Sequence, residues 1–153
     1  MRKNSGSLRQ WDSMVKQKSL TIAQTYDVST KPDTLVLFST SFQNDETNKI
    51  MAFDYVKNHA SAMTIEDTAC GRALKELNLF SADSGISQDE AYQIWGIAST
   101  RMVLHARGNI TAFIKNAHPL STFCQYELPT ILLNPNIKTI NGKDKFQLFA
   151  EPW

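Results

Sequence analysis

The sequence predicts an α/β fold in which a helical N-terminal part packs on a small, mostly parallel four-stranded sheet with flanking helices. Three observations lead to this prediction. Short apolar runs alternate with longer segments of helical periodicity. Neither an internal repeat nor a low-complexity tract interrupts this alternation. The length of 153 residues suits one compact domain with a hydrophobic core, so we expect a single domain over residues 1–153.

The first part of the chain is expected to be helical. Residues 5–25 predict a helix whose apolar side chains fall loosely on one side. Residues 1–33 then form a helical lead-in that ends at the Ser-Thr-Lys-Pro-Asp break, residues 29–33. The apolar run 34–39 predicts a short buried strand, and residues 46–60 predict the next helix.

Two more helices are expected over residues 64–77 and 88–106. Each begins with a hydroxyl residue followed three positions later by a carboxylate, which is the capping-box pattern. The pairs are Thr64 with Asp67 and Ser87 with Glu90. We expect Gly108 to end the longer helix, because glycine adopts the left-handed conformation that closes many helices.

The last third of the chain is expected to supply the remaining strands. They are residues 109–114, residues 121–128 stopped by Pro129, residues 137–140 closed by an Asn-Gly turn, and an edge strand over residues 145–149. Ligands of open parallel sheets bind beyond the carboxyl ends of the strands. Those ends are expected near Ser39, near residues 115–118 and at Glu127.

Composition excludes several classes of function. The chain has 16 basic and 15 acidic residues, and this near-neutral charge argues against binding to nucleic acid or to a membrane surface. No apolar run reaches the roughly 20 residues of a membrane span. We also expect no signal peptide, because the first 20 residues hold no apolar block.

Metal and nucleotide motifs are also missing from the sequence. The three histidines are scattered without ligand spacing, so we expect no metal. There is no Gly-x-Gly-x-x-Gly and no P-loop, so any nucleotide must be held in another way. We expect the two cysteines, Cys70 and Cys124, to be buried thiols, because a secreted disulfide scaffold usually carries more.

Taken singly, the polar candidates have plain structural explanations. Glu66 lies in the first turn of a helix, where a carboxylate is favoured by the helix dipole. Trp95 fits the core side of an amphipathic helix, and Ser99 follows one turn later on the same face. Glu127 ends an apolar run, and its position fits an exposed edge residue as well as a functional carboxylate.

Taken together, three segments resemble the ADP-ribosyl cyclase family. Residues 64–68, Thr-Ile-Glu-Asp-Thr followed by Gly71, are similar to its Thr-Leu-Glu-Asp-Thr segment. Residues 94–99, Ile-Trp-Gly-Ile-Ala-Ser, are similar to its Phe-Trp-Lys-Thr-Val-Ser helix. Residues 121–127 reproduce its Ser-Thr-Phe-x-x-x-Glu at identical spacing. The resemblance covers residues 34–142 and keeps the order of the segments.

The resemblance implies an ADP-ribosyl cyclase-like fold and a site for NAD as the substrate, with no further cofactor. Glu127 matches the catalytic glutamate, and Glu66, with Asp67 beside it, matches the residue that gates cyclisation against hydrolysis. Trp95 matches the aromatic wall at the nicotinamide end. The residues matching those that hold ribose and phosphate are Ser99, Thr122 and Phe123.

The chain departs from the family pattern in one part of this site. Where the family has Trp-Ser-Arg at the end of its first strand, this chain has Phe38, Ser39 and Thr40. Phe38 can still stack on a ligand, but Thr40 cannot give the charged, bidentate grip of arginine. Phosphate binding must then use Ser39, backbone amides or another cation. The family's disulfides are also missing, which favours an intracellular or bacterial setting.

We therefore expect an NAD glycohydrolase that cleaves the nicotinamide–ribose bond mainly by hydrolysis. By analogy of fold, we expect it to be the toxin domain of a bacterial secreted or contact-dependent effector. Such a domain would act in the target-cell cytoplasm and have an immunity protein as its partner. The alternatives are a cyclase that makes a signalling nucleotide, a ribonuclease toxin, or an inactive nucleotide-binding module.

Overall fold

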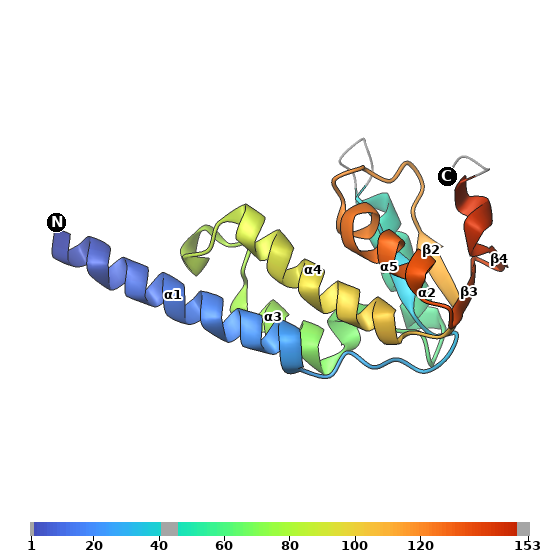
Figure 1. Cartoon of the computed structure of the whole chain (residues 1–153), viewed down its shortest axis with the longest axis horizontal. Coiled ribbons are helices and arrows are strands. Elements are labelled where there is room, and N and C mark those ends of the chain that lie inside the picture. The colour runs from blue at the N-terminus through green and yellow to red at the C-terminus, as the bar shows by residue number, and fades with distance from the viewer. Residues whose placement is uncertain (1, 41–45, 150–153) are drawn as a thin grey trace.

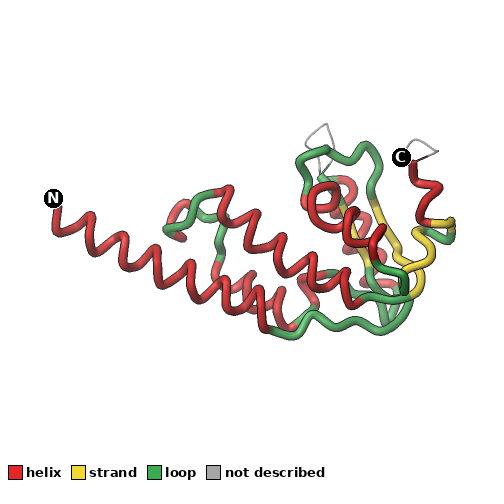
Figure 2. Tube along the Cα trace, viewed as in Figure 1, coloured by secondary structure: helices red, strands yellow, loops and turns green. Residues whose placement is uncertain are grey.

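The computed structural model describes the backbone of residues 2–40 and 46–149, with side chains for residues 14–40 and 46–147. Helices α1 (Arg2–Thr25), α3 (Ala69–Leu77) and α4 (Gln88–His105) pack together as a helical part. The N-terminal half of α1 extends beyond the other elements (Figure 1). The strands gather at the other end of the molecule (Figure 2).

The sheet has four strands in the order β1-β2-β3-β4. Strands β1 (Val36–Phe38), β2 (Gly108–Phe113) and β3 (Ile137–Ile140) are parallel, and β4 (Lys143–Asp144) pairs antiparallel with β3. Helix α2 (Thr47–Asn58) packs on β1 and β2, and α5 (Leu128–Leu133) packs on α4. The predicted fold class is confirmed: helices pack on a small, mostly parallel four-stranded sheet.

Both predicted capping boxes are present. The Ser87 hydroxyl accepts a hydrogen bond from the Glu90 N–H, and the Glu90 carboxylate accepts one from the Ser87 N–H. The box at Thr64 caps a single 3-10 turn, η1 (Ile65–Asp67). Helix α3 begins after this turn, at a second cap formed by the Thr68 hydroxyl. The expected helix over residues 64–77 is therefore two short elements.

The strand predicted over residues 121–128 is wrong. This segment is helical and includes a π-helical turn, η3 (Phe123–Glu127), that runs directly into α5. Ser121 begins it, because its hydroxyl accepts a hydrogen bond from the Cys124 N–H. Pro129 has no N–H to donate and its ring crowds the carbonyl four residues earlier, which favours a wider turn before it. Pro129 therefore does not end a strand but lies in the first turn of α5.

The edge strand predicted over residues 145–149 is also wrong, because this segment is the 3-10 helix η4 (Lys145–Phe149). The Lys145 amine is buried and donates hydrogen bonds to the carbonyls of Ile131 and Asn134, at 2.8 and 2.7 Å. These bonds draw the chain back over the end of α5, so only the two residues of β4 pair with the sheet.

The end of α4 also differs from the prediction. The helix stops at His105, and Gly108 begins strand β2 with a φ of 85°. The side-chain amide of Asn134 closes the helix by donating to the carbonyls of Val103, Leu104 and Ala106. The end of α4 is therefore capped by the side chain of Asn134, at the end of α5, and not by Gly108.

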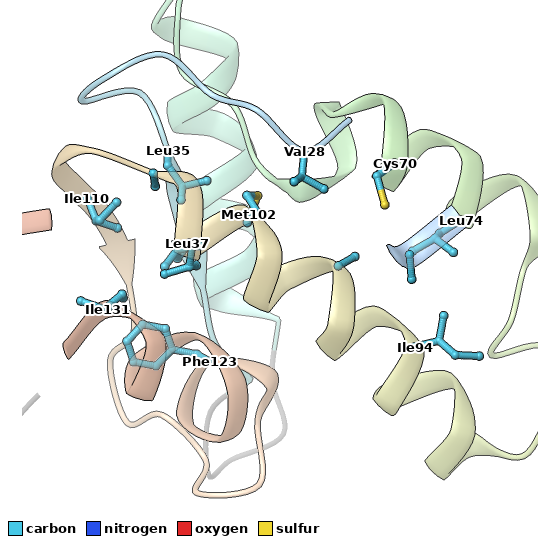
Figure 3. Packing of buried hydrophobic residues seen from close by; sticks show 14 of the residues in the cluster. Val28, Leu35, Leu37, Cys70, Leu74, Ile94, Met102, Ile110, Phe123 and Ile131 are labelled. Carbon is cyan, nitrogen blue, oxygen red and sulfur yellow. The ribbon is translucent and has the colours of Figure 1, made fainter. Parts of the chain in front are cut away.

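One hydrophobic core joins the helical part to the sheet (Figure 3). Cys70 lies in this core and Cys124 is half-buried, and both are free thiols. The prediction of a buried thiol is thus confirmed for Cys70 and only partly for Cys124. None of the helices described here is both long enough and apolar enough to cross a membrane.

Candidate active site

A cleft of about 670 Å³ lies between the helical part and the sheet. Its walls come from the end of β1, from α2, from η1 and α3, from α4, and from the π-helical turn. Most of the predicted site residues line it: Phe38, Ser39, Glu66, Trp95, Ser99, Thr122 and Glu127. Segments far apart in the sequence therefore meet at one cleft.

Glu127 lies at the buried side of the cleft, with 4% of its surface exposed. Among the described residues, none donates a hydrogen bond to its carboxyl group and none forms an ion pair with it. Burial without a compensating partner disfavours the charged form, and it raises the pKa of Glu127 to about 8. The carboxyl group is thus held in the cleft wall with its hydrogen-bonding capacity unused.

A close approach between two helices positions Glu127. Gly96 on α4 lies against the ring of Tyr126, the residue before Glu127. A Cβ atom at position 96 would lie 2.6 Å from the Tyr126 Cζ atom, closer than carbon atoms pack. A side chain at position 96 would require the Tyr126 ring to shift, so glycine at this position allows the ring to pack directly on α4. This contact lies next to Glu127 in the chain.

A second close approach positions Glu66. This residue lies in the 3-10 turn η1, which rests on the start of α3 at Gly71. A Cβ atom at position 71 would overlap the carbonyl oxygen of Ile65, so a larger residue would push the turn away. The carboxylate of half-buried Glu66 lies 3.7 Å from the amine of Lys75, whose side chain is exposed. Glu66 and Glu127 thus have contrasting surroundings, because Glu66 is paired with a cation and Glu127 has no partner.

Helix α4 supplies one continuous wall of the cleft. Gln88, Tyr92, Trp95 and Ser99 all line it, and their spacing of four, three and four residues keeps them within about 60° on the helix surface. This stripe covers about 16 Å of helix length. Exposure falls along it, from exposed Gln88 and Tyr92 through half-buried Trp95 to buried Ser99. The cleft is therefore open at the start of α4 and closed near Ser99.

Two predicted site residues lie outside the cleft wall. Phe123 is fully buried and belongs to the hydrophobic core (Figure 3). The Asp67 carboxylate accepts a hydrogen bond from the Thr64 N–H at 2.9 Å and so completes the capping box. Asp67 therefore has a structural role in shaping the turn that carries Glu66.

Two cations that we did not predict also line the cleft, Lys49 and Lys75. Lys49 projects from α2 beside the end of β1, and its amine lies 5.6 Å from the centre of the Phe53 ring. That ring packs edge-on against Phe38 at 5.5 Å. In the sequence both lysines look like solvated residues on polar helix faces, so no local signal could identify them.

The described part of the chain contains no group of three His, Cys, Asp or Glu side chains that could hold a metal ion. The polar groups that line the cleft are three carboxylates (Glu46, Glu66 and Glu127), two ammonium groups, hydroxyls and amides. This set suits an organic substrate that carries both a positive and a negative charge. A cationic part could approach Glu127, while an anionic part could approach a lysine.

Comparison with solved structures shows that the chain has an ADP-ribosyl cyclase-like fold. It is similar to a structure of CD38 described as showing a conformationally flexible covalent enzyme–substrate complex. The TM-score is 0.55 at 15% sequence identity, over 95% of this chain and 84% of that chain. It is also similar to Aplysia cyclase complexed with substrate NGD and product cGDPR, with a TM-score of 0.53 and 18% identity.

A third similar structure is ADP ribosyl cyclase complexed with N1-cIDPR, with a TM-score of 0.50 and 18% identity. The match covers 82% of this chain and 61% of Aplysia cyclase, and 72% of this chain and 48% of the third structure. This chain thus corresponds to only part of these two cyclases. By sequence, no family model and no curated protein matches it. The predicted relationship is therefore confirmed at the level of the fold.

Burial of Glu127 predicts a specific dependence of stability on pH. Below pH 4.5 the group is protonated in both the folded and the unfolded chain, so it adds no pH dependence. Between pH 4.5 and about 8 the unfolded chain has lost this proton and the folded chain keeps it. The free energy of unfolding therefore falls as pH rises, by about 1.4 kcal/mol per unit, and levels off above about pH 8.

We expect Glu127→Gln to remove this fall, so that the variant melts at a higher temperature than the wild type at pH 8–9. Thermal unfolding of both proteins from pH 5 to pH 9 measures the effect. Glu76→Gln, at an exposed position on α3, is the matched control and should follow the wild type. Parallel curves for wild type and Glu127→Gln would show that the carboxyl is not buried in solution.

Proposed function

We propose that this chain is an NAD glycohydrolase that releases nicotinamide and ADP-ribose, with cyclic ADP-ribose as a minor product. The observation that carries the proposal is the buried carboxyl group of Glu127, without a protein partner, in an aromatic cleft. The fold supports it, because a similar structure, Aplysia cyclase, is described as complexed with substrate NGD and product cGDPR. The activity itself is our inference from this site.

The reaction needs stabilisation of a positive charge. When the C1′–N bond breaks, its electron pair leaves with nicotinamide, which departs as a neutral molecule. The ribose carbon that remains has oxocarbenium character, and a carboxylate close to it stabilises this charge. Water then adds its oxygen to C1′ and loses a proton, giving ADP-ribose. Glu127, in its ionised form, performs the stabilising step.

Aromatic side chains suit the other end of the scissile bond. The pyridinium ring of NAD is a cation before cleavage, and Trp95 and Phe38 both face the cleft. Stacking of a desolvated cation on such a ring contributes roughly 1–2 kcal/mol. This attraction is lost when nicotinamide becomes neutral, which helps the product to leave. The same side chains keep bulk water away from the reacting carbon.

Ionisation of Glu127 is coupled to substrate binding in this mechanism. In the ligand-free protein the pKa of about 8 leaves most of the carboxyl protonated at pH 7. An arriving pyridinium cation favours the ionised form and so lowers the pKa of Glu127 in the complex. A buried carboxyl therefore becomes the carboxylate that the reaction needs at the moment when its partner arrives.

Glu66 and Lys75 line the cleft from η1 and α3. In this proposal Glu66 helps to decide whether water or the purine ring of the same molecule reaches the ribose carbon. The amine of Lys75, 3.7 Å away, reduces the negative field of this carboxylate. We propose hydrolysis as the main outcome, because the open cleft admits water at this side.

Replacing the proposed catalytic carboxylate provides the main test. Glu127→Gln keeps the size of the side chain but removes its charge, so we expect loss of about two to four orders of magnitude in turnover of NAD. Nicotinamide release from purified protein measures it, with folding checked by circular dichroism. Nicotinamide release by Glu127→Gln at the wild-type rate would show that Glu127 is not the catalytic carboxylate. Cleavage of total RNA without nicotinamide release would favour the ribonuclease alternative instead.

The pH dependence of the reaction tests the coupling. Since the ionised carboxyl is the active form, kcat/KM for NAD should rise with pH, by up to tenfold per unit, and level off near pH 8. The kcat profile reports the complex, where the substrate cation lowers the pKa, and should level off at lower pH. Steady-state kinetics from pH 5 to pH 9 measures both. A kcat/KM that is flat across this range would contradict the mechanism.

We propose that Lys49 supplies the phosphate-binding cation that Thr40 cannot. It lines the cleft beside Ser39 and Thr40, and among the described residues it forms no ion pair. Lys49→Met should raise KM for NAD by about 10- to 100-fold, since a charge-assisted bond is worth about 1.5–3 kcal/mol, and change kcat little. Lys57→Met, on the same helix outside the cleft, is the control. An unchanged KM would assign the phosphates elsewhere.

We also propose a biological role for the chain: it acts as the toxic domain of a delivered effector that depletes NAD in the target-cell cytoplasm. An immunity protein that covers the cleft would be its partner. Production of the wild-type chain inside bacterial cells should lower cellular NAD and stop growth, whereas Glu127→Gln should do neither. Growth arrest by both proteins at normal NAD levels would exclude this role.

A further inference from the structure

Two exposed aromatic rings stand at the open end of the cleft and have no part in the proposed mechanism. Phe80 and Tyr92 both line the cleft, and 40% and 49% of their surfaces are exposed. Their ring centres lie 4.9 Å apart at an interplanar angle of 66°, an edge-on arrangement. We call this pair the aromatic rim. Exposed apolar side chains gathered at a cleft mouth commonly mark a surface that binds a ligand.

The aromatic rim is held in place by hydrogen bonds around it. The Gln88 side-chain amide donates to the Phe80 carbonyl at 2.9 Å, and the Ser84 hydroxyl donates to the Leu79 carbonyl at 2.8 Å. Tyr92 is fixed on helix α4, one turn after Gln88. Because both rings are already positioned, stacking a planar ligand on them would cost little side-chain entropy.

The position of the rim relative to Glu127 indicates which part of a dinucleotide reaches it. Tyr92 lies three residues before Trp95 and seven before Ser99, so it is about 10 Å from Ser99 along the helix axis. Tyr126, next to Glu127, packs on Gly96 in the middle of α4. Lys49 lies on α2 and Thr40 follows β1, at the sheet side of the cleft, whereas Tyr92 lies near the start of α4.

The reacting ribose carbon lies between the leaving base and the phosphates in any such dinucleotide. If this carbon is at Glu127 and the phosphates approach Lys49, the base must extend in the other direction. That direction follows the stripe of α4 from Trp95 to Tyr92 and the open end of the cleft. The order of side chains along the cleft is therefore cation, carboxylate, tryptophan and aromatic rim.

We propose that Phe80 and Tyr92 form a second station for the leaving base, outside the Trp95 wall. The inference rests on the proposed function. The neutral, planar nicotinamide moves outward after bond cleavage and stacks on the rim before it reaches solvent. The Oε1 atom of Gln88 remains available to accept a hydrogen bond from the carboxamide N–H, because only the Nε2 atom is bonded to Phe80. The rim thus selects the leaving group and retains it as an inhibitory product.

The test measures binding of the two products separately. Isothermal titration calorimetry gives the Kd of nicotinamide and of ADP-ribose for the wild-type protein and for Tyr92→Ala and Phe80→Ala. We expect each variant to bind nicotinamide about five- to tenfold more weakly and ADP-ribose with unchanged affinity. Phe146→Ala, at a 60% exposed aromatic outside the cleft, is the control and should change neither value.

Each contrary outcome is distinct. Weaker binding of ADP-ribose with unchanged nicotinamide would assign the rim to the purine end and overturn the proposal. Unchanged binding of both products would show that the two rings only pack against each other, and would also overturn it. Failure of the proposed function looks different, because the wild-type protein would then release no nicotinamide from NAD in the activity assay. The binding experiment uses no turnover, so the two results are independent.

Discussion

The candidate site depends on burying one carboxyl group without a protein partner. An unpaired carboxylate in a nonpolar environment is costly, so the group holds its proton instead, and its pKa rises to about 8. The surrounding core must therefore be stable enough to keep Glu127 in place. That core is continuous from the helical part through to the sheet, and it includes Phe123 on the same π-helical turn. Retaining a costly group is characteristic of sites that need its reactivity.

Close contacts at two glycines lie beside two of the glutamates of the cleft, Glu127 and Glu66. Gly96 lets the π-helical turn approach α4, and Gly71 lets the 3-10 turn with Glu66 approach α3. The two glutamates come from different halves of the chain, yet each is positioned by a glycine on a neighbouring helix. The cleft between them lies where the helical part meets the sheet, so small shifts of either part would change its width.

Much of the fold could be predicted from the sequence where local signals are strong. Capping boxes marked the starts of η1 and α4, and apolar runs marked β1, β2 and β3. The strand predicted from Ser121 to Leu128 is wrong. Its apolar and aromatic residues fit a strand, and Pro129 is as compatible with the end of a strand as with the start of a helix. Glu127 in this segment still lines the cleft, because the resemblance to the family specified a residue and not a backbone conformation.

The remaining cleft residues could not be predicted, because tertiary packing alone brings them there. Lys49 is half-buried on α2, Tyr92 is exposed on α4 and Phe80 lies in a loop, and the sequence around each of them resembles ordinary surface. Conversely, Asp67 and Phe123 belong to matched motifs but serve a helix cap and the core. The matched motifs meet at one cleft, while side-chain direction depends on the turn type of each segment.

A crystal structure of the Glu127→Gln variant soaked with NAD tests the central claim most directly. The account predicts intact dinucleotide in the cleft, with the ribose that carries nicotinamide within hydrogen-bond distance of the side-chain amide at position 127. It also predicts the diphosphate on the Lys49 side and the pyridinium ring toward Trp95. Dinucleotide bound away from position 127, or with its adenosine end at that position, would contradict the account.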